Sequence, residues 1–251
     1  MKEHRRLYEF ARPLAGLYVH ALERLEVVGL ENIPSTGPVI LVANHINSMD
    51  IVTIALPVMR QTHYMAKVEL FRVPVVGGIL RLMGSFPVRR GESDRESLRV
   101  AEEVLHAGQI LGVFPEGHRS GTGKMAAGLP GVALIAMRTG APLVPVAITG
   151  TERVLKGLRI GPWAAKVRLV YGKPFHLPPD LTRRSGDLKR GIDFIMRQIA
   201  ALLPPEYRGV YAEPSPQPVA AAPDAAALAS GGGDLLSAEA RLAGTPTPPV
   251  G

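Results

Sequence analysis

The sequence predicts an α/β fold in which flanking helices cover both faces of a mainly parallel sheet. Strand-like apolar runs alternate along the chain with helical segments, which is the pattern of parallel strands joined by crossover helices. Residues 38–44, PVILVAN, are apolar almost throughout, as expected of a strand that is covered on both faces. With 251 residues, the chain is long enough for one well-buried domain of this kind.

Residues 1–24 are predicted to form an amphipathic N-terminal helix. Their apolar side chains recur at spacings of three and four, and the arginines lie outside that stripe. Pro13 is expected to kink the helix. Such a helix either packs on its own domain or lies in a lipid interface with its arginines at the headgroups, and the sequence leaves both open.

Residues 25–211 carry the alternating elements of the predicted domain. Strands are expected within seven apolar segments: 25–29, 38–44, 62–67, 84–88, 109–115, 142–149 and 166–172. Helices are expected within 51–59, 132–139 and 187–203, and in one further segment that a capping box of Ser93 and Glu96 begins and Gly108 ends.

Residues 212–251 are predicted to be a disordered tail, because Ala, Pro, Gly and Ser dominate them. The tail holds one basic and four acidic side chains, so the remaining body carries 28 basic and 18 acidic side chains. This excess favours an anionic partner, which can be a nucleic acid, an anionic membrane surface or a phosphorylated substrate.

Several classes of protein are excluded or disfavoured. The chain has no cysteine, which excludes disulfides, thiolate metal sites and cysteine nucleophiles. The N-terminus lacks the apolar core and cleavage site of a signal peptide, and no run of eighteen apolar residues occurs. We therefore expect a protein on the cytoplasmic side of the membrane that associates with it peripherally.

Three polar clusters each follow a strand-like run. They are NHINSMD after residue 43, RRG after residue 88, and EGHRSGTGK after residue 115. In open parallel sheets, ligands bind outside the carboxyl ends of the strands, so one crevice can collect all three clusters.

The first cluster contains His45 and Asp50. On one continuous helix they would lie about 140° apart, but across a strand-to-helix turn Asp50 can fold back to the imidazole. A carboxylate on one ring nitrogen fixes the tautomer and stabilises the imidazolium, which would make His45 a general base. The alternative is a turn that happens to contain a histidine. A metal site is disfavoured because two ligands are too few for zinc.

No protein nucleophile accompanies this base. The sequence lacks a G-x-S-x-G elbow, and Ser120 lies in an arginine-containing loop without that pattern. A base without a protein nucleophile indicates that the attacking hydroxyl belongs to the substrate. Direct acyl or phosphoryl transfer, without a covalent enzyme intermediate, would follow.

Basic residues in the other two clusters can bind an anion. Arg89, Arg90, Arg119 and Lys124 lie among glycines that let backbone amides approach a phosphate. The Arg89–Arg90 pair can equally be a solvated pair at a helix start. The spacing of the third cluster is not that of a Walker loop, so nucleoside-triphosphate chemistry is disfavoured.

Together these segments resemble the lysophospholipid acyltransferase superfamily of 1-acyl-glycerol-3-phosphate and glycerol-3-phosphate acyltransferases. The family blocks NH-x-S-x-x-D, V-x-R-G, FPEGTRS and V-P-V are matched in order over residues 39–148, and MAKVELF is similar to a family Lys-x-Glu-Leu segment. The matched residues are Asn44, His45, Asp50, Lys67, Arg90, Phe114, Pro115, Glu116, Gly117, Arg119, Ser120 and Pro145. Asn47 departs from the family Ser, and His118 from the family Thr.

The resemblance implies a glycerolphosphate acyltransferase-like fold and transfer of an acyl group from acyl-CoA or acyl carrier protein to a lysophosphatidic-acid-like acceptor. It implies that His45 is the base, that Asp50 orients it, and that no metal or organic cofactor takes part. The substrate-binding residues that it implies are Asn44, Lys67, Arg90, Glu116, Gly117 and Arg119. Glu116 would bind a substrate hydroxyl or orient an arginine, or be purely structural.

Two other interpretations stay open. The acceptor can be glycerol-3-phosphate, another lysophospholipid or an amino-acid lipid. The protein can also be an inert lipid-binding protein, although a pure binder needs no base such as His45. Nucleic acid is not an expected partner, because the basic residues form no patch interleaved with aromatic residues.

Overall fold

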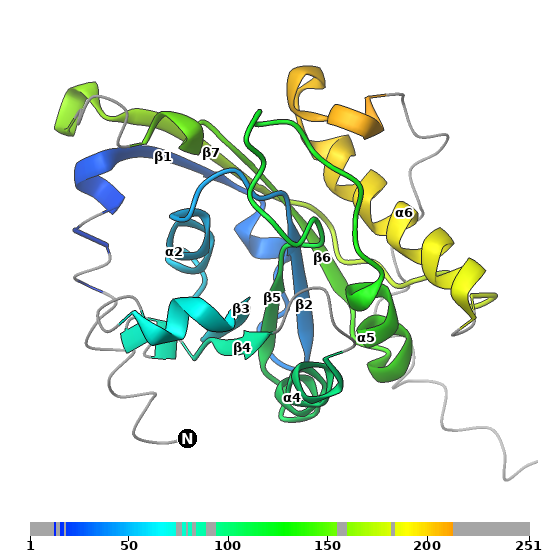
Figure 1. Ribbon diagram of the computed structural model, residues 1–251. Helices are drawn as coiled ribbons and strands as arrows, with labels where there is room; N and C mark the ends of the chain where they lie inside the picture. Colours follow the sequence, from blue (N-terminus) through cyan, green and yellow to red (C-terminus); the bar gives the residue numbers. More distant parts are fainter. Residues whose placement is uncertain are drawn as a thin grey trace, which may run out of the picture. The chain divides into compact units, whose positions relative to one another are not determined.

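The computed structural model describes residues 13, 16–17, 19–73, 77–78, 80–81, 84–88, 94–154, 160–181 and 184–212. Within them, seven strands form one sheet in the order β1-β7-β6-β2-β5-β3-β4 (Figure 1). The strands are β1 (Glu23–Val28), β2 (Val39–Ala43), β3 (Thr62–Lys67), β4 (Phe86–Val88), β5 (Ile110–Val113), β6 (Leu143–Thr149) and β7 (Ala165–Tyr171).

The directions of the strands bring several loops to one edge of the sheet. From β6 to β4, five neighbouring strands are parallel, whereas β7 pairs antiparallel with β6 and β1 pairs parallel with β7. We call the edge at which β2 to β6 end the carboxyl edge. Because β1 and β7 run the other way, both begin at this same edge.

Helices cover both faces of this sheet. Helix α2 (Asp50–Ala55) lies over one face, and α4 (Arg95–His106), α5 (Gly131–Thr139) and α6 (Ser185–Leu202) lie over the other (Figure 1). Short 3₁₀ helices occur in the connections: η1 (Leu30–Asn32), η2 (Val68–Arg72), η3 (Thr151–Arg153), η4 (Gly161–Trp163), η5 (Pro205–Tyr207) and η6 (Gly209–Tyr211). The predicted α/β fold with a mainly parallel, covered sheet is confirmed.

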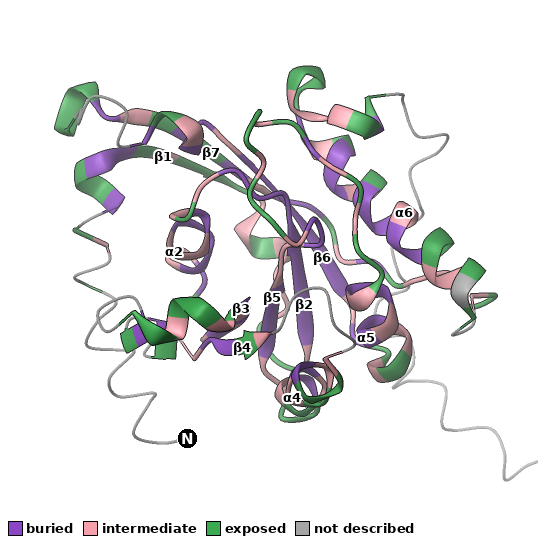
Figure 2. Ribbon diagram, viewed as in Figure 1, coloured by how far each residue is buried: buried purple, intermediate pink, exposed green. Residues whose placement is uncertain are grey.

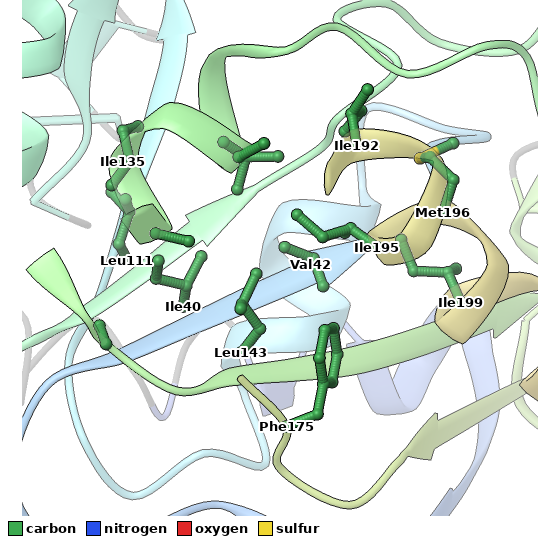
Figure 3. Close-up of a cluster of buried hydrophobic side chains, with 14 of the residues drawn as sticks. Ile40, Val42, Leu111, Ile135, Leu143, Phe175, Ile192, Ile195, Met196 and Ile199 are labelled. Carbon is green, nitrogen blue, oxygen red and sulfur yellow. The ribbon is translucent and has the colours of Figure 1, made fainter. Parts of the chain in front are cut away.

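The sheet divides the core into two parts, one on each face, and the central strand β2 contributes side chains to both. Side chains alternate along a strand, so Ile40 and Val42 face α4 to α6 while Val39 and Leu41 face α2. Figure 2 shows the central strands β2, β5 and β6 as buried and the helices as exposed on their outer surfaces. In the larger part of the core, side chains from the strands meet those of α6, including Ile195 (Figure 3).

Some element boundaries differ from the predicted ones. The predicted capping box is wrong: Asp94 caps α4, and its side chain accepts a hydrogen bond from the backbone N–H of Ser97 at 3.0 Å. Aspartate and serine are equally good capping residues, and the structure uses the position one residue later. Helix α2 ends at Ala55, earlier than predicted, and β1 begins at Glu23, two residues before the predicted strand.

Both predicted terminal segments lie largely outside the described residues. Residues 13, 16–17 and 19–22 are helical, residues 23 and 24 belong to β1 instead of the predicted helix over residues 1–24, and the other residues of that segment are not described. Residues 213–251 of the predicted tail are not described either. In the part of the chain that the structure describes, no helix has the length and apolar character needed to cross a bilayer.

Gly112 in β5 leaves room for the ring of Tyr64 on the neighbouring strand β3. The two residues are paired in the sheet, and Tyr64 is fully buried. A Cβ atom at position 112 would overlap the Tyr64 ring. The absence of a side chain at this position is therefore a packing requirement rather than a need for an unusual backbone conformation.

We predict that Gly112→Ala destabilises the protein by about 1–3 kcal/mol, because the added methyl group forces a buried ring out of its place. The free energy of unfolding in urea measures this change. Gly186→Ala is the matched control: it adds the same methyl group to helix α6, where nothing lies within 4 Å of it. It should leave stability unchanged or raise it by up to about 1 kcal/mol. Equal stability of the two variants would contradict the packing argument.

Candidate active site

Asn44 fixes the chain where it leaves β2 at the carboxyl edge. Its buried side-chain amide donates to the carbonyl of Ile148 and accepts from the N–H of the same residue, both at 2.9 Å. These two bonds continue the pairing of β2 with β6 beyond the strand end. The predicted substrate-binding residue Asn44 thus has both ends of its amide occupied by backbone, and the next residue, His45, starts from a fixed point.

His45 and Asp50 meet across the turn between β2 and α2. His45 Nδ1 lies 2.9 Å from Asp50 Oδ2, and both side chains are buried. The same Oδ2 accepts the backbone N–H groups of Ile46 at 2.6 Å and Asn47 at 2.8 Å. One carboxylate oxygen therefore orders the whole turn and the imidazole together.

This arrangement leaves one nitrogen of His45 for chemistry. Because Nδ1 is directed to Asp50, Nε2 is the nitrogen that can take a proton, and no described residue forms a hydrogen bond with it. The ring of Phe114 stacks on the imidazole, with 4.0 Å between ring centroids and 19° between planes. Tyr64 stacks in turn on Phe114, with centroids 5.8 Å apart. The imidazole plane is thus held by packing as well as by Asp50.

Glu116 holds the backbone of His45 from the loop after β5. The residue is 1% exposed; Oε1 accepts the N–H of His45 at 3.0 Å, and Oε2 accepts the N–H of Ala126 at 2.8 Å. Burial raises the pKa of the Glu116 carboxyl, and the two N–H donors oppose that rise. The predicted substrate-binding or arginine-orienting role stays a prediction; the observed contacts of this carboxyl are with backbone.

The loops after β2 and β5 bind each other directly. The N–H of Ser120 donates to the carbonyl of His45 at 2.7 Å, and the Arg119 guanidinium donates to Ser48 Oγ at 2.8 Å. Gly117, in the loop after β5, has φ of +71°, a left-handed conformation that favours glycine. A basic group is therefore present on the exposed side of the turn that carries the His45–Asp50 pair.

Asn47 connects this turn to a third loop. Its side-chain Nδ2 donates to the carbonyl of Thr151 in η3 at 2.9 Å, and its Oδ1 accepts the N–H of Met49 at 3.1 Å. The loops that follow β2, β5 and β6 are thus linked by hydrogen bonds at the carboxyl edge.

The remaining predicted residues lie further from this cluster or are not described. Lys67 ends β3 at the same edge, is exposed, and forms an ion pair with Glu69 at 3.3 Å. Arg89 and Arg90 lie outside the described residues. His118 is exposed, next to Arg119. Within the described ranges, no three His, Asp or Glu side chains converge as a metal site requires.

Sequence reasoning did not foresee two contacts that shape the site. Phe114 was matched as part of a motif, but its stacking on His45 was not predicted. The backbone role of Asn44 was also missed. The position of Asn44 directly after a fully apolar strand was a usable signal, because a buried amide at a strand end must find backbone partners.

A family model described as Acyltransferase matches residues 24–149, which is half of the chain and spans the whole His45–Asp50 turn and the Glu116 loop. The chain belongs to the acyltransferase family. Among its relatives, a chloroplastic 1-acyl-sn-glycerol-3-phosphate acyltransferase of Arabidopsis thaliana is 29% identical over 177 residues, which cover 68% of this chain and 49% of the relative. The 1-acyl-sn-glycerol-3-phosphate acyltransferase of Bacillus subtilis is 29% identical over 171 residues, which cover 68% and 83%.

A solved structure shows the same fold. The acyltransferase aligns with the 1-acyl-sn-glycerophosphate (LPA) acyltransferase PlsC of Thermotoga maritima with a TM-score of 0.57 and 28% sequence identity, over 79% of each chain. A chloroplastic relative of Brassica napus is 31% identical over 155 residues, which are 45% of its length. The chain therefore spans about half the length of the plant relatives that it matches.

We predict that Glu116→Gln lowers stability by about 1–3 kcal/mol and lowers kcat. The amide keeps one oxygen acceptor but turns its NH₂ group toward a second backbone N–H, which is left without a bond. Thermal unfolding and steady-state kinetics measure the two effects. Glu102→Gln is the control: Glu102 lies on α4 and forms a surface ion pair with Arg138 of α5, so its substitution should change neither stability nor kcat by much. A raised acceptor KM with unchanged stability would instead favour the substrate-binding role.

Proposed function

We propose that this acyltransferase moves a fatty acyl group from acyl-CoA or acyl carrier protein to the hydroxyl of a lysophosphatidic-acid-like acceptor, in phospholipid biosynthesis. The observation that carries the proposal is the buried His45–Asp50 pair, whose Nε2 is left for proton transfer at an edge that also presents Arg119. The relatives whose names state a 1-acyl-sn-glycerol-3-phosphate acyltransferase activity support the choice of acceptor.

The proposed reaction needs no protein nucleophile. His45 Nε2 removes the proton of the acceptor hydroxyl, and the oxygen attacks the thioester carbonyl of the donor. Asp50 stabilises the imidazolium that forms, through the bond to Nδ1. When the tetrahedral intermediate collapses, the carbon–sulfur bond breaks and the thiolate takes the proton from Nε2. A backbone N–H near the carbonyl would stabilise the oxyanion.

Basic side chains would hold the acceptor phosphate. Arg119 is exposed in the loop after β5, and its bond to Ser48 holds it against the turn that carries His45. Lys67 is the last residue of β3, and Arg90 comes two positions after β4 in the sequence; both strands end at the same edge. A guanidinium suits a phosphate because it presents two parallel N–H donors.

A peripheral location on the cytoplasmic side of the membrane would give this enzyme access to a lipid acceptor. The body of the chain carries an excess of basic side chains, which favours an anionic lipid surface. The N-terminal amphipathic segment is the proposed second element of that association.

We predict that His45→Ala lowers kcat by about 10²–10⁴-fold while the protein stays folded, because a positioned general base contributes about that factor. Release of free thiol from acyl-CoA in the presence of lysophosphatidic acid measures turnover, and circular dichroism checks the fold. His118→Ala removes an exposed histidine from the neighbouring loop and should retain most of the activity. Substantial turnover by a folded His45→Ala variant would contradict the assignment of the base.

We also predict that lysophosphatidic acid is the preferred acceptor and that Arg90→Ala raises the KM for it far more than the KM for the donor. The reason is that the guanidinium binds the phosphate of the acceptor and not the thioester. An assay that combines several acceptors with acyl-CoA and acyl carrier protein donors measures both. Preference for glycerol-3-phosphate, another lysophospholipid or an amino-acid lipid would contradict the assignment of lysophosphatidic acid as the acceptor. Absence of turnover with every pair would favour an inert lipid-binding protein.

A further inference from the structure

Glu23 is a buried carboxyl group behind the His45–Asp50 pair. It is the first residue of β1, so it lies at the carboxyl edge although its strand runs the other way. The residue is 3% exposed. Strand alternation directs it, with Leu25, to the face that α2 covers (Figure 1). The mechanism proposed above does not use it.

The hydrogen bonds around Glu23 indicate that it carries a proton. The hydroxyl of Thr53 on α2 lies 2.9 Å from Glu23 Oε1 and 3.1 Å from the carbonyl of Met49. A hydroxyl has a single proton to donate, and both neighbours would be acceptors if Glu23 were ionised. Both contacts become hydrogen bonds when Glu23 donates to Thr53 and Thr53 donates to Met49.

The charges around Glu23 also favour its protonated form. Its Oε2 atom is buried without a hydrogen-bond partner among the described residues, and no described basic group acts on it. Burial raises its pKa to about 7, the Thr53 bond opposes the rise, and the negative charge of Asp50 adds to it. Other charged groups of the strands alternate to the opposite face or are exposed: Arg24, Glu26, Lys166 and Arg168. His20, on the helix before β1, is exposed.

The two buried carboxyls differ in their donors. Asp50 Oδ2 accepts the imidazole and two backbone N–H groups, whereas Glu23 has contact with one hydroxyl. When two carboxyls share a buried region, the one that accepts more hydrogen bonds keeps the charge and the other stays protonated. We propose that Glu23 is a neutral carboxylic acid that donates to Thr53, positions the first turn of α2, and leaves the negative charge of this pair of carboxyls on Asp50, which holds the His45 imidazole.

The positioning acts through two adjacent residues. The carbonyl of Met49, which the Thr53 hydroxyl reaches, belongs to the residue directly before Asp50. Loss of the Glu23 proton would remove one bond from this chain and place a second negative charge near Asp50. Glu23 is thus a positioning residue, and its kinetic effect, though not its protonation, rests on the acyl transfer proposed above.

The proton also links stability to pH. The pKa of Glu23 is about 7 in the folded protein against an ordinary value of 4.5. The folded state therefore binds more protons than the unfolded state between these values, so the contribution of Glu23 to stability is complete below pH 4.5 and is lost as the pH rises to about 7. A glutamine at this position donates to Thr53 at every pH and cannot ionise.

Three variants test the proposal. We predict that Glu23→Gln keeps kcat at pH 6 within about twofold of the wild type, and that it removes a fall in kcat centred near pH 7. Its Tm should rise relative to that of the wild type between pH 5 and pH 8. Glu23→Ala should lower kcat at every pH with little change in acceptor KM. The control is Glu26→Gln, an exposed residue of the same strand paired with Arg168, which should keep the wild-type pH profile.

A direct titration of the Glu23 carboxyl tests its protonation independently of turnover. Carbon-13 NMR of the wild-type side-chain carboxyl, assigned by through-bond correlation, should show Glu23 titrating near pH 7. Titration near 4.5, or equal pH profiles of kcat and Tm in the wild type and Glu23→Gln, would overturn the proposal. If no donor and acceptor pair gives turnover, the proposed function fails, while the NMR and Tm measurements still decide the protonation of Glu23.

Discussion

The site depends on one carboxylate oxygen, Asp50 Oδ2, and the three donors that converge on it. The imidazole of His45 and the N–H groups of Ile46 and Asn47 all point to this atom. These bonds hold the chain between the end of β2 and the start of α2 in a single turn, so the same contacts fix the orientation of the His45 imidazole and the local backbone. Removal of this oxygen would leave two buried or half-buried N–H groups without an acceptor as well as an unsupported imidazole.

Three buried carboxyl groups at the carboxyl edge meet the cost of burial in different ways. Asp50 collects three donors, and Glu116 places each of its oxygens on a backbone N–H. Glu23 has one hydroxyl contact, and its proton takes the place of further donors. An unpaired buried charge costs several kcal/mol, so protonation is the less costly state for the carboxyl with the fewest donors. The edge can therefore hold three buried acidic residues close to the His45 imidazole.

The sequence was sufficient for the fold class and for the gathering of polar clusters at one edge, because both follow from local patterns. Continuous apolar runs predict covered strands, and the turn after such a strand lies at the carboxyl edge. Contacts between distant residues were not predictable in this way. The bonds from His45 to Glu116 and from Asn44 to Ile148 join positions 71 and 104 residues apart, and only the pairing of the strands brings them together. Glu23 was missed for the same reason: its burial follows from the reversed direction of β1.

The asparagine at position 47, where the family pattern has serine, makes two hydrogen bonds with its side chain. A serine at this position could accept the N–H of Met49 through its hydroxyl, as a turn residue often does. The longer amide does this with Oδ1 and, with Nδ2, also reaches the carbonyl of Thr151. Serine has one oxygen and a shorter side chain, so it cannot span both partners. Asparagine therefore links the turn of His45 and Asp50 to the loop after β6, just as Asn44 links the end of β2 to β6 itself.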